Sequence, residues 1–172
     1  KKYIWALPLA AILFVSQLVG AAERREILNY IELGAPSEDS RQAVGELLEA
    51  FKWSWANQDV DAHIVLFSED AEWINAYARM FRGRKDLAVF LEDRLFPNFD
   101  SLLSIEEIAN SKLISIRHLG DAAAVIHMAT DGRRGDSAIP GDLMRRTHIH
   151  LVVEKQQGEW LIVHTAIMDA RN

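Results

Sequence analysis

Histidines in the C-terminal half have the clearest capacity for chemistry. His148 and His150 are two positions apart, so in a strand their imidazoles share one face. Two imidazoles at this spacing can chelate one metal ion, with His127 or His164 from a neighbouring strand as a third ligand. The other interpretation places the pair on a polar or interface side of the sheet. That interpretation is favoured, and no metal is predicted.

Composition excludes several classes of protein. The 172 residues are 49% hydrophobic and 26% charged, which is typical of a globular chain and not of disorder. The net charge of −6 comes without a basic stripe, which argues against nucleic acid as a partner. The chain has no cysteine, which excludes disulfides and thiolate chemistry. No glycine-rich dinucleotide fingerprint is present, and no cofactor is predicted.

Residues 1–22 have the pattern of a secretory signal peptide. Two lysines precede an apolar stretch from Tyr3 to Val15, and small residues lead to a cleavage point after Ala21 or Ala22. The alternative is a retained anchor, because 3–22 is just long enough to cross a bilayer. The sequence therefore predicts a periplasmic or secreted protein, with a membrane as partner only if this segment is retained.

Helical periodicity marks the next part of the chain. Residues 23–36 are predicted as a short amphipathic helix and linker. A core helix is predicted to begin after Ser37, a good N-cap residue. A second helix follows over 60–67, with Asp59 as its cap, and a third over 85–95. The first of these core helices has an apolar stripe at helical spacing, which consists of Val44, Leu47, Leu48, Phe51 and Trp55.

Strands dominate the rest. Short strands are predicted over 71–77 and near 80–84, a loop over 98–104, and long strands over 105–118, 122–130, 143–155 and 159–169. In the 143–155 strand, alternation separates Thr147, Ile149, Leu151 and Val153 from Arg146, His148, His150, Val152 and Glu154. In the last strand, one face is predicted to hold Trp160, Ile162, His164, Ala166 and Met168.

Both faces of the last strand are apolar, so both must be covered. The helices can cover one face. A second copy of the chain is predicted to cover the other, which makes the protein a homodimer through its sheet.

The order of these elements resembles the NTF2-like, or cystatin-like cone, superfamily in its SnoaL-like branch, near the SgcJ/EcaC-type and DUF4440-like members. The resemblance covers 37–169 and includes the closing Gly158-x-Trp160-x-Ile162-x-His164 strand. It implies an α+β fold over 37–172, in which a curved antiparallel sheet wraps around the N-terminal helices and leaves a pocket at its open end. Members commonly dimerise through the sheet.

The resemblance also implies a function for the pocket. Ketosteroid isomerases and polyketide cyclases of this fold pair a base with a donor inside an apolar cone, where desolvation tunes the base. Here His164 or His127 would be the base and Tyr77 the donor in isomerase, cyclase or dehydratase chemistry on a small apolar molecule. All three could instead be structural. The predicted pocket wall consists of Trp55, Trp73, Phe81, Phe90 and Met168.

Two alternatives remain open. The domain could be a non-catalytic module for ligand binding or dimerisation, in which case the histidines should lie outside the pocket. The stretch Trp160-x-Ile162-Val163 is also similar to iota-class carbonic anhydrases. Their His-His-His-Ser-Ser run is replaced here by the sequence His-Thr-Ala-Ile-Met over 164–168, which disfavours that activity.

Overall fold

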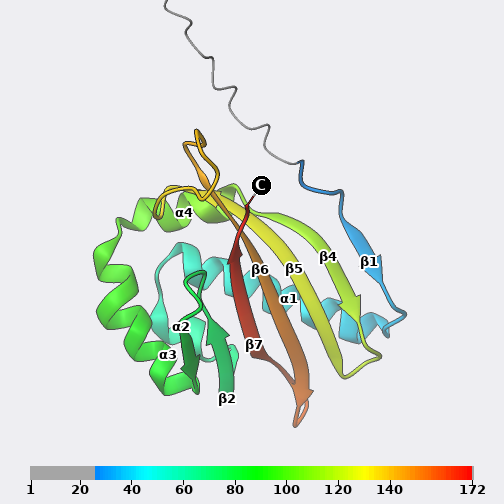
Figure 1. Cartoon of the computed structure of the whole chain (residues 1–172). Helices are drawn as coiled ribbons and strands as arrows, with labels where there is room; N and C mark the ends of the chain where they lie inside the picture. Colours follow the sequence, from blue (N-terminus) through cyan, green and yellow to red (C-terminus); the bar gives the residue numbers. More distant parts are fainter. Residues whose placement is uncertain (1–25, 172) are drawn as a thin grey trace, which may run out of the picture.

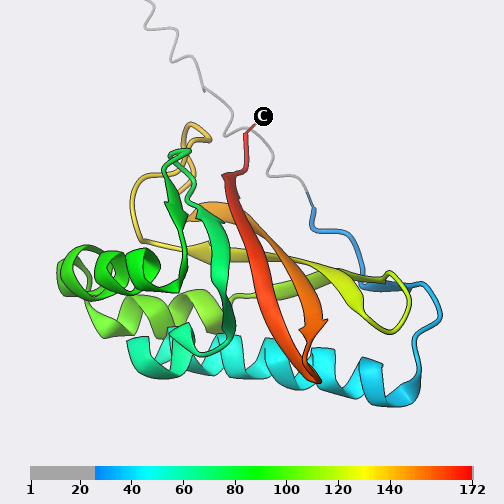
Figure 2. The same cartoon turned by 90° about the horizontal axis from the view of Figure 1, so that it is seen from below.

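In the computed structural model the described residues, 26–171, form a curved sheet with its helices gathered on one face (Figures 1 and 2). We call the face toward the helices the inner face and the opposite one the outer face. The predicted signal peptide over 1–22 lies outside the described residues. Among the helices of 26–171, none is both long and apolar enough to cross a membrane.

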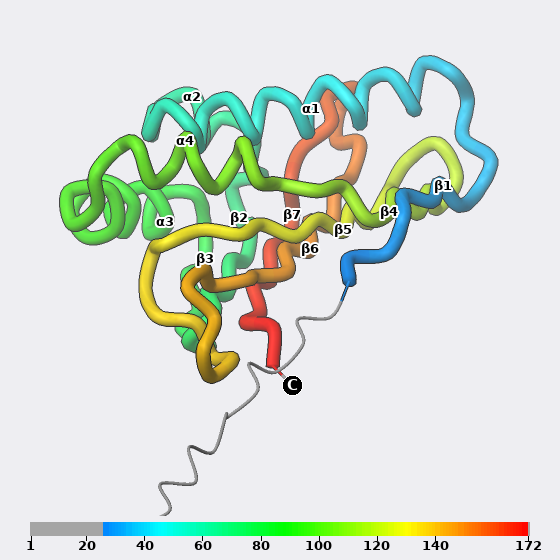
Figure 3. The backbone as a smooth tube through the Cα atoms, turned by 90° about the horizontal axis from the view of Figure 1, so that it is seen from above, coloured from blue at the N-terminus to red at the C-terminus, as the bar shows by residue number. Residues whose placement is uncertain are grey.

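Helix α1, Glu38–Ala56, runs along the inner face from the β1–β4 edge of the sheet (Figure 3). It begins where the Ser37 side chain accepts a hydrogen bond from the Ser40 amide, as predicted. Helix α2, Val60–Ile64, begins in the same way, because the Asp59 carboxylate accepts from the Ala62 amide at 2.9 Å. The predicted stripe of α1 is buried at Val44, Leu47, Leu48 and Phe51.

The described residues form a seven-stranded sheet in the order β1-β4-β5-β6-β7-β2-β3. Two neighbouring pairs are parallel, β1 with β4 and β2 with β7, and the others are antiparallel. The strands are β1 Ile31–Leu33, β2 Phe67–Ile74, β3 Met80–Arg82, β4 Lys112–His118, β5 Ala123–Gly132, β6 Arg145–Gln156 and β7 Glu159–Asp169.

The predicted helix over 23–36 is wrong for its described part. Residues 31–33 form β1, which pairs with β4 over Ser115–Arg117. Glu32 fixes this strand, because its carboxylate accepts from Arg41 Nε at 2.7 Å and lies 3.2 Å from His118 Nε2. A helix this short is marginal by itself, whereas the edge of β4 offers unpaired backbone groups.

The predicted loop over 98–104 and the first half of the strand predicted over 105–118 are also wrong. Helix α3, Arg84–Phe90, continues as a π turn over Leu91–Leu95 and a 3-10 turn over Phe96–Asn98. Helix α4 then covers Ser101–Ala109, and Asp100 caps it by accepting from the Leu102 amide at 2.9 Å. Packing of α4 on α1 overrides the strand propensity of its isoleucines.

A bulge in β7 changes which residues face the helices. Val152 pairs with His164 and Val153 with Ile162, so Val163 has no partner across the ladder. An extra residue reverses the alternation that follows it. Trp160 and Ile162 are buried, but beyond the bulge it is Thr165 that is buried. The prediction that His164 shares the face of Trp160 and Ile162 is therefore wrong.

One histidine lies in the core. His63 is 1% exposed, its Nδ1 is 2.9 Å from the Ser54 hydroxyl, and its ring contacts Phe51, Trp55 and Phe67. Burial lowers the pKa of His63 to about 3, so the imidazole is neutral at physiological pH. The sequence alone did not distinguish it from an exposed helix residue.

Candidate functional site

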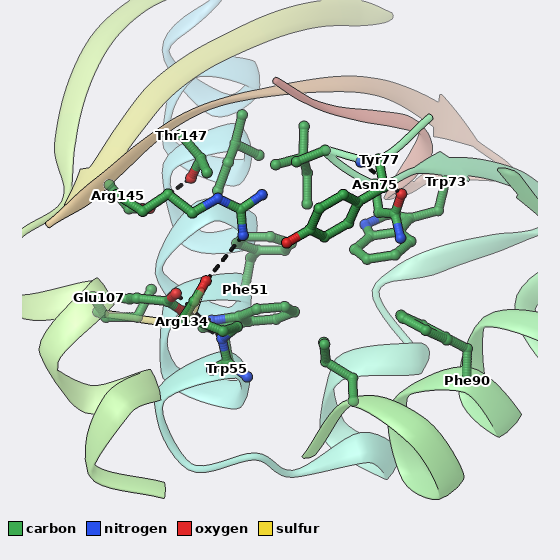
Figure 4. Close-up of a pocket in the computed structure, with 16 residues that line it drawn as sticks. Phe51, Trp55, Trp73, Asn75, Tyr77, Phe90, Glu107, Arg134, Arg145 and Thr147 are labelled. Carbon is green, nitrogen blue, oxygen red and sulfur yellow. Dashed lines mark hydrogen bonds and ion pairs between the residues drawn. The ribbon is translucent and has the colours of Figure 1, made fainter. Parts of the chain in front are cut away.

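A cavity of about 90 Å³ lies between the inner face and the helices (Figure 4). Its aromatic wall comes from three elements: Phe51 and Trp55 of α1, Trp73 of β2 and Phe90 of α3. The ring centroids of Trp73 and Phe90 are 5.6 Å apart. Ile149 of β6 and Ile167 of β7 add aliphatic surface. The cavity can therefore hold an apolar group of a small molecule.

Three of the five predicted wall residues, Trp55, Trp73 and Phe90, line this cavity. Phe81 does not, because it is 7% exposed and packs behind them, with its ring centroid 4.2 Å from that of Phe90. Met168 does not either. It follows the bulge in β7, so it lies on the outer face and is 47% exposed.

One end of the cavity is polar and is built around Glu107 of α4. Its carboxylate accepts from the Trp55 indole at 3.0 Å and from Arg134 Nε at 3.2 Å. Arg134 also donates from Nη2 to the Ser104 hydroxyl at 2.5 Å. The side chains of Arg134 and Glu107 are 8% and 13% exposed, so this is a buried ion pair.

Arg145, the first residue of β6, extends the polar end. It donates from Nε to the Asp169 carboxylate at 2.6 Å and from Nη1 to the Arg134 carbonyl at 2.9 Å. Next to it on the inner face, the Thr147 hydroxyl is paired with that of Thr130 at 2.9 Å. Ion pairs thus hold both cavity arginines, which fixes where the remaining nitrogens of the guanidinium groups point (Figure 4).

The three predicted catalytic residues are not brought together. Tyr77 lies at the cavity, on the turn between β2 and β3, with its ring 5.0 Å from Arg145 Cζ. His127 and His164 do not line the cavity. Both lie on the outer face, where His127 pairs across the sheet with His150 and His164 lies 3.8 Å from the Glu72 carboxylate.

The outer face instead collects His127, His148 and His150. His127 Nε2 is 2.8 Å from His148 Nδ1, and the His127 and His150 rings stack at 4.1 Å. Burial lowers the pKa of His127 to about 4, and the neighbouring His150 and His148 add to this effect. Burial likewise lowers the pKa values of His148 and His150. Each ring therefore favours its neutral form.

This histidine cluster does not have the geometry of a metal centre. Two of its nitrogens face each other at hydrogen-bond distance, and the third ring is stacked, so the lone pairs do not converge on one point. Among the described residues, no group of three His, Cys, Asp or Glu side chains could hold a metal ion. A broader depression of about 410 Å³ adjoins His127 and His148, but its wall includes Leu28, which is 77% exposed.

The polar end of the cavity did not follow from the sequence patterns. Glu107 lay in a segment predicted as strand, and Arg134 in a predicted loop, so neither position carried a signal. Arg145 could have been found. It is two residues before Thr147, and extending the inner-face alternation of the 143–155 strand by one step leads to it.

Comparison with known proteins supports the fold. No protein-family model matches the chain, and no curated protein matches it in sequence. It is similar to the crystal structure of a ketosteroid isomerase-like protein from Erwinia carotovora atroseptica, with a TM-score of 0.63 and 14% identity over 78% of this chain and 99% of that one.

Two further solved structures agree. An NTF2-like protein of unknown function from Pseudomonas putida has a TM-score of 0.60 and 14% identity, covering 79% of this chain and 90% of that one. A protein with a cystatin-like fold from Nostoc punctiforme has a TM-score of 0.56 and 17% identity, covering 83% of this chain and 97% of that one. The chain therefore has the NTF2-like, cystatin-like α+β fold that the sequence resemblance implied.

Proposed function

We propose that this domain binds a small, largely apolar molecule in the cavity between the inner face and the helices. The observation that supports this best is the aromatic and aliphatic lining around about 90 Å³. Burial of apolar surface there contributes roughly 25 cal/mol per Å². The polar groups at one end can then orient the ligand, as is usual in small-molecule pockets.

Simple binding is favoured over acid–base catalysis by where the titratable groups lie. His127 and His164, the two imidazoles that could act as bases, are outside the cavity. The cavity carboxylate, Glu107, is engaged by Arg134 and Trp55. An isomerase-type reaction is the second candidate, because Glu107 and Tyr77 both line the cavity and one similar structure is described as ketosteroid isomerase-like.

The test compares two adjacent residues of β7. Ile167→Phe should fill the cavity, whereas Met168→Phe adds the same ring on the outer face. Butan-2-one and butane-1-thiol, whose short aliphatic chains suit a cavity of about 90 Å³, serve as probes, and methyl NMR of Ile149 reports their binding. We expect binding to the unaltered chain and to Met168→Phe and its loss in Ile167→Phe. Equal binding by both variants, or none by the unaltered chain, would reject the cavity as the site.

We also propose a homodimer formed through the outer face. Val125, Val152 and His164 form one row across β5, β6 and β7 on that face, and each is half-buried. Val152→Glu would place a charge in the middle of the proposed interface. Sedimentation should show a dimer for the unaltered chain and a monomer for this variant. A monomer in both would contradict the proposal.

Export is proposed from the sequence pattern of residues 1–22. Cell fractionation of the tagged full chain should release it with the periplasm without detergent. Retention in the membrane fraction would favour the anchor, and recovery in the cytoplasm would contradict export.

A further inference from the structure

The polar end of the cavity has more hydrogen-bond donors than acceptors. Arg145 Nη2 and Arg134 Nη1 are buried and have no hydrogen-bond partner among the described residues. The two side chains are 10% and 8% exposed. A buried donor without a partner is costly, and a charged one is more costly than a neutral one. Two such nitrogens beside one cavity therefore point to a ligand that brings acceptor oxygens.

The other nitrogens of both guanidinium groups are already in use. Arg145 donates from Nε to Asp169 and from Nη1 to the Arg134 carbonyl, so only Nη2 has no partner among the described residues. Arg134 donates from Nε to Glu107 and from Nη2 to Ser104, so only Nη1 has no partner within residues 26–171. These partners fix the plane of each guanidinium group. The remaining nitrogen of each group therefore cannot rotate to share a partner that is already bonded.

The acceptors that line the cavity are also engaged. Both oxygens of Glu107 accept, one from the Trp55 indole and both from Arg134. The hydroxyls of Thr130 and Thr147 bond each other, one donating and one accepting, and neither accepts from the two arginine nitrogens. The described side chains around the cavity thus leave the two arginine nitrogens to a molecule from outside.

Tyr77 lies at the rim of the cavity, next to Arg145. Its ring lies over the Arg145 guanidinium, and Figure 4 shows its hydroxyl directed into the cavity. A Cβ built on Gly135 would be 3.4 Å from both the Tyr77 hydroxyl and Arg145 Nη1, so the phenol and the guanidinium meet at one part of the rim. Tyr77 is 73% exposed, which leaves its side chain free to turn outward and uncover Arg145.

We propose that the ligand is a short-chain carboxylic acid, bound as its carboxylate to Arg145 Nη2 with its hydrocarbon part against Trp55 and Phe51. This inference rests on the proposed small-molecule cavity and names the ligand class. Hydrogen bonds from guanidinium to carboxylate are roughly twice as strong as neutral ones. The fixed charges of Arg134, Arg145, Glu107 and Asp169 sum to zero, so one added anion meets no excess of negative charge.

The volume limits the length of the acid. A cavity of roughly 150 Å³ encloses a benzene molecule. The cavity here is smaller, at about 90 Å³. It suits an aliphatic chain of a few carbons, and an aromatic acid would project past Tyr77.

The test uses the unaltered chain and four probes of matched size: butanoate, butanamide, butan-1-ol and inorganic phosphate. Calorimetry measures affinity, and methyl NMR of Ile149 and Ile167 locates each probe. We expect butanoate to bind at least about tenfold more tightly than butanamide, because a charge-assisted bond to arginine is replaced by a neutral one. Butan-1-ol should bind weakly in the same cavity.

The matched variants are Arg145→Gln and Arg146→Gln, neighbours on opposite faces of β6. Arg145→Gln should remove the preference for butanoate over butanamide, and Arg146→Gln should keep it. If Arg145→Gln does not fold, the butanoate–butanamide comparison in the unaltered chain still decides.

Each other outcome overturns a distinct part of the inference. Equal binding of butanoate, butanamide and butan-1-ol would overturn the carboxylate but leave a small-molecule cavity. Phosphate binding as tightly as butanoate would show an unspecific anion site and overturn the role of the hydrocarbon part. No binding by any of the four, with butan-2-one or butane-1-thiol still bound, would overturn the inference while the proposed function stands.

Discussion

Alternate residues of β6 face two different environments. Arg145, Thr147 and Ile149 face the inner cavity, whereas Arg146 and His148 face outward. Arg145 and Arg146 are neighbours, each is about nine-tenths buried and each is paired with an aspartate, at 2.6 and 2.8 Å. Arg146 binds both oxygens of Asp131. Arg145 binds Asp169 through Nε alone and keeps Nη2 for the cavity.

The histidines show the same contrast. The three imidazoles of the outer cluster have lowered pKa values, which is often taken as a mark of an active site. They interact with one another, and two of them, His127 and His148, line the larger depression on the outer face. On the inner face the polar groups are arginine and carboxylate, joined in ion pairs around an apolar space. The aromatic lining, more than titration, therefore distinguishes the candidate site in this molecule.

The largest expected effect is on the buried ion pair of the inner site. Glu107→Gln leaves the Arg134 charge buried without its partner, which should cost about 3 kcal/mol or more of unfolding free energy. Urea denaturation measures it. Glu106→Gln is the control one residue away, where the partner Arg133 is 66% exposed, and little change is expected. Similar losses in both would remove the contrast between the buried and exposed pairs.

The core histidine should make stability depend on pH more strongly than the outer cluster does. Burial lowers the pKa of His63 from 6.5 to about 3. Between pH 6.5 and pH 3 the imidazole therefore binds a proton in the unfolded chain but stays neutral in the folded chain. This contribution to stability is complete above pH 6.5 and is lost as pH falls toward 3, by up to about 1.4 kcal/mol per pH unit.

Unfolding free energies measured from pH 7 to pH 4 test this. His63→Leu should flatten the pH dependence more than His127→Gln, because the outer imidazole is partly solvated and its pKa is lowered only to about 4. NMR titration of the ring carbons should show His63 unprotonated throughout this range. A His63 midpoint near 6.5 would contradict the argument.

Glycine at position 132 should matter for the position of Glu107. A Cβ there would lie 2.4 Å from Glu107 Cγ, so Gly132→Ala must displace the carboxylate or the strand end. Overpacking of this kind costs about 1 to 3 kcal/mol.

Gly45→Ala is the matched control for Gly132→Ala. Its Cβ meets nothing within 4 Å and it lies inside α1, so it should stabilise by roughly 0.5 to 1 kcal/mol. Thermal unfolding shows whether each variant has a lower or a higher Tm than the unaltered chain. A neutral Gly132→Ala would mean that the carboxylate is not held in place.

The smallest expected effect is that of His164 on the outer face. His164→Gln removes a contact of 3.8 Å with the partly exposed Glu72, so stability should not change measurably. Affinity for the cavity probes should stay within about twofold, since His164 does not line the cavity and its contact with Glu72 contributes little. A large loss of affinity would mean that His164 takes part in ligand binding. It would contradict the conclusion that the inner face alone forms the binding site.

Sequence patterns predicted the long elements well. The helix after Ser37 and the strand over 159–169 occur as expected, because a long apolar stripe or alternation fits only one secondary structure. The sequence patterns predicted the structure less well where a single residue determines which face of a strand the following side chains lie on. Val163 reads as an ordinary strand residue, yet its bulge moves His164 and Met168 to the outside, and bulges depend on how two strands pair.

The sequence by itself determined the α+β class, the long helix after Ser37, the order of the four long C-terminal strands and the apolar wall residues Trp55, Trp73 and Phe90, because local periodicity and burial preference carry that information. Only the tertiary structure decided which polar groups share a cavity. Glu107, Arg134 and Arg145 are up to 38 positions apart in sequence. They meet because α4 docks on α1 beside the β5–β6 loop, and no local pattern encodes a contact across that distance.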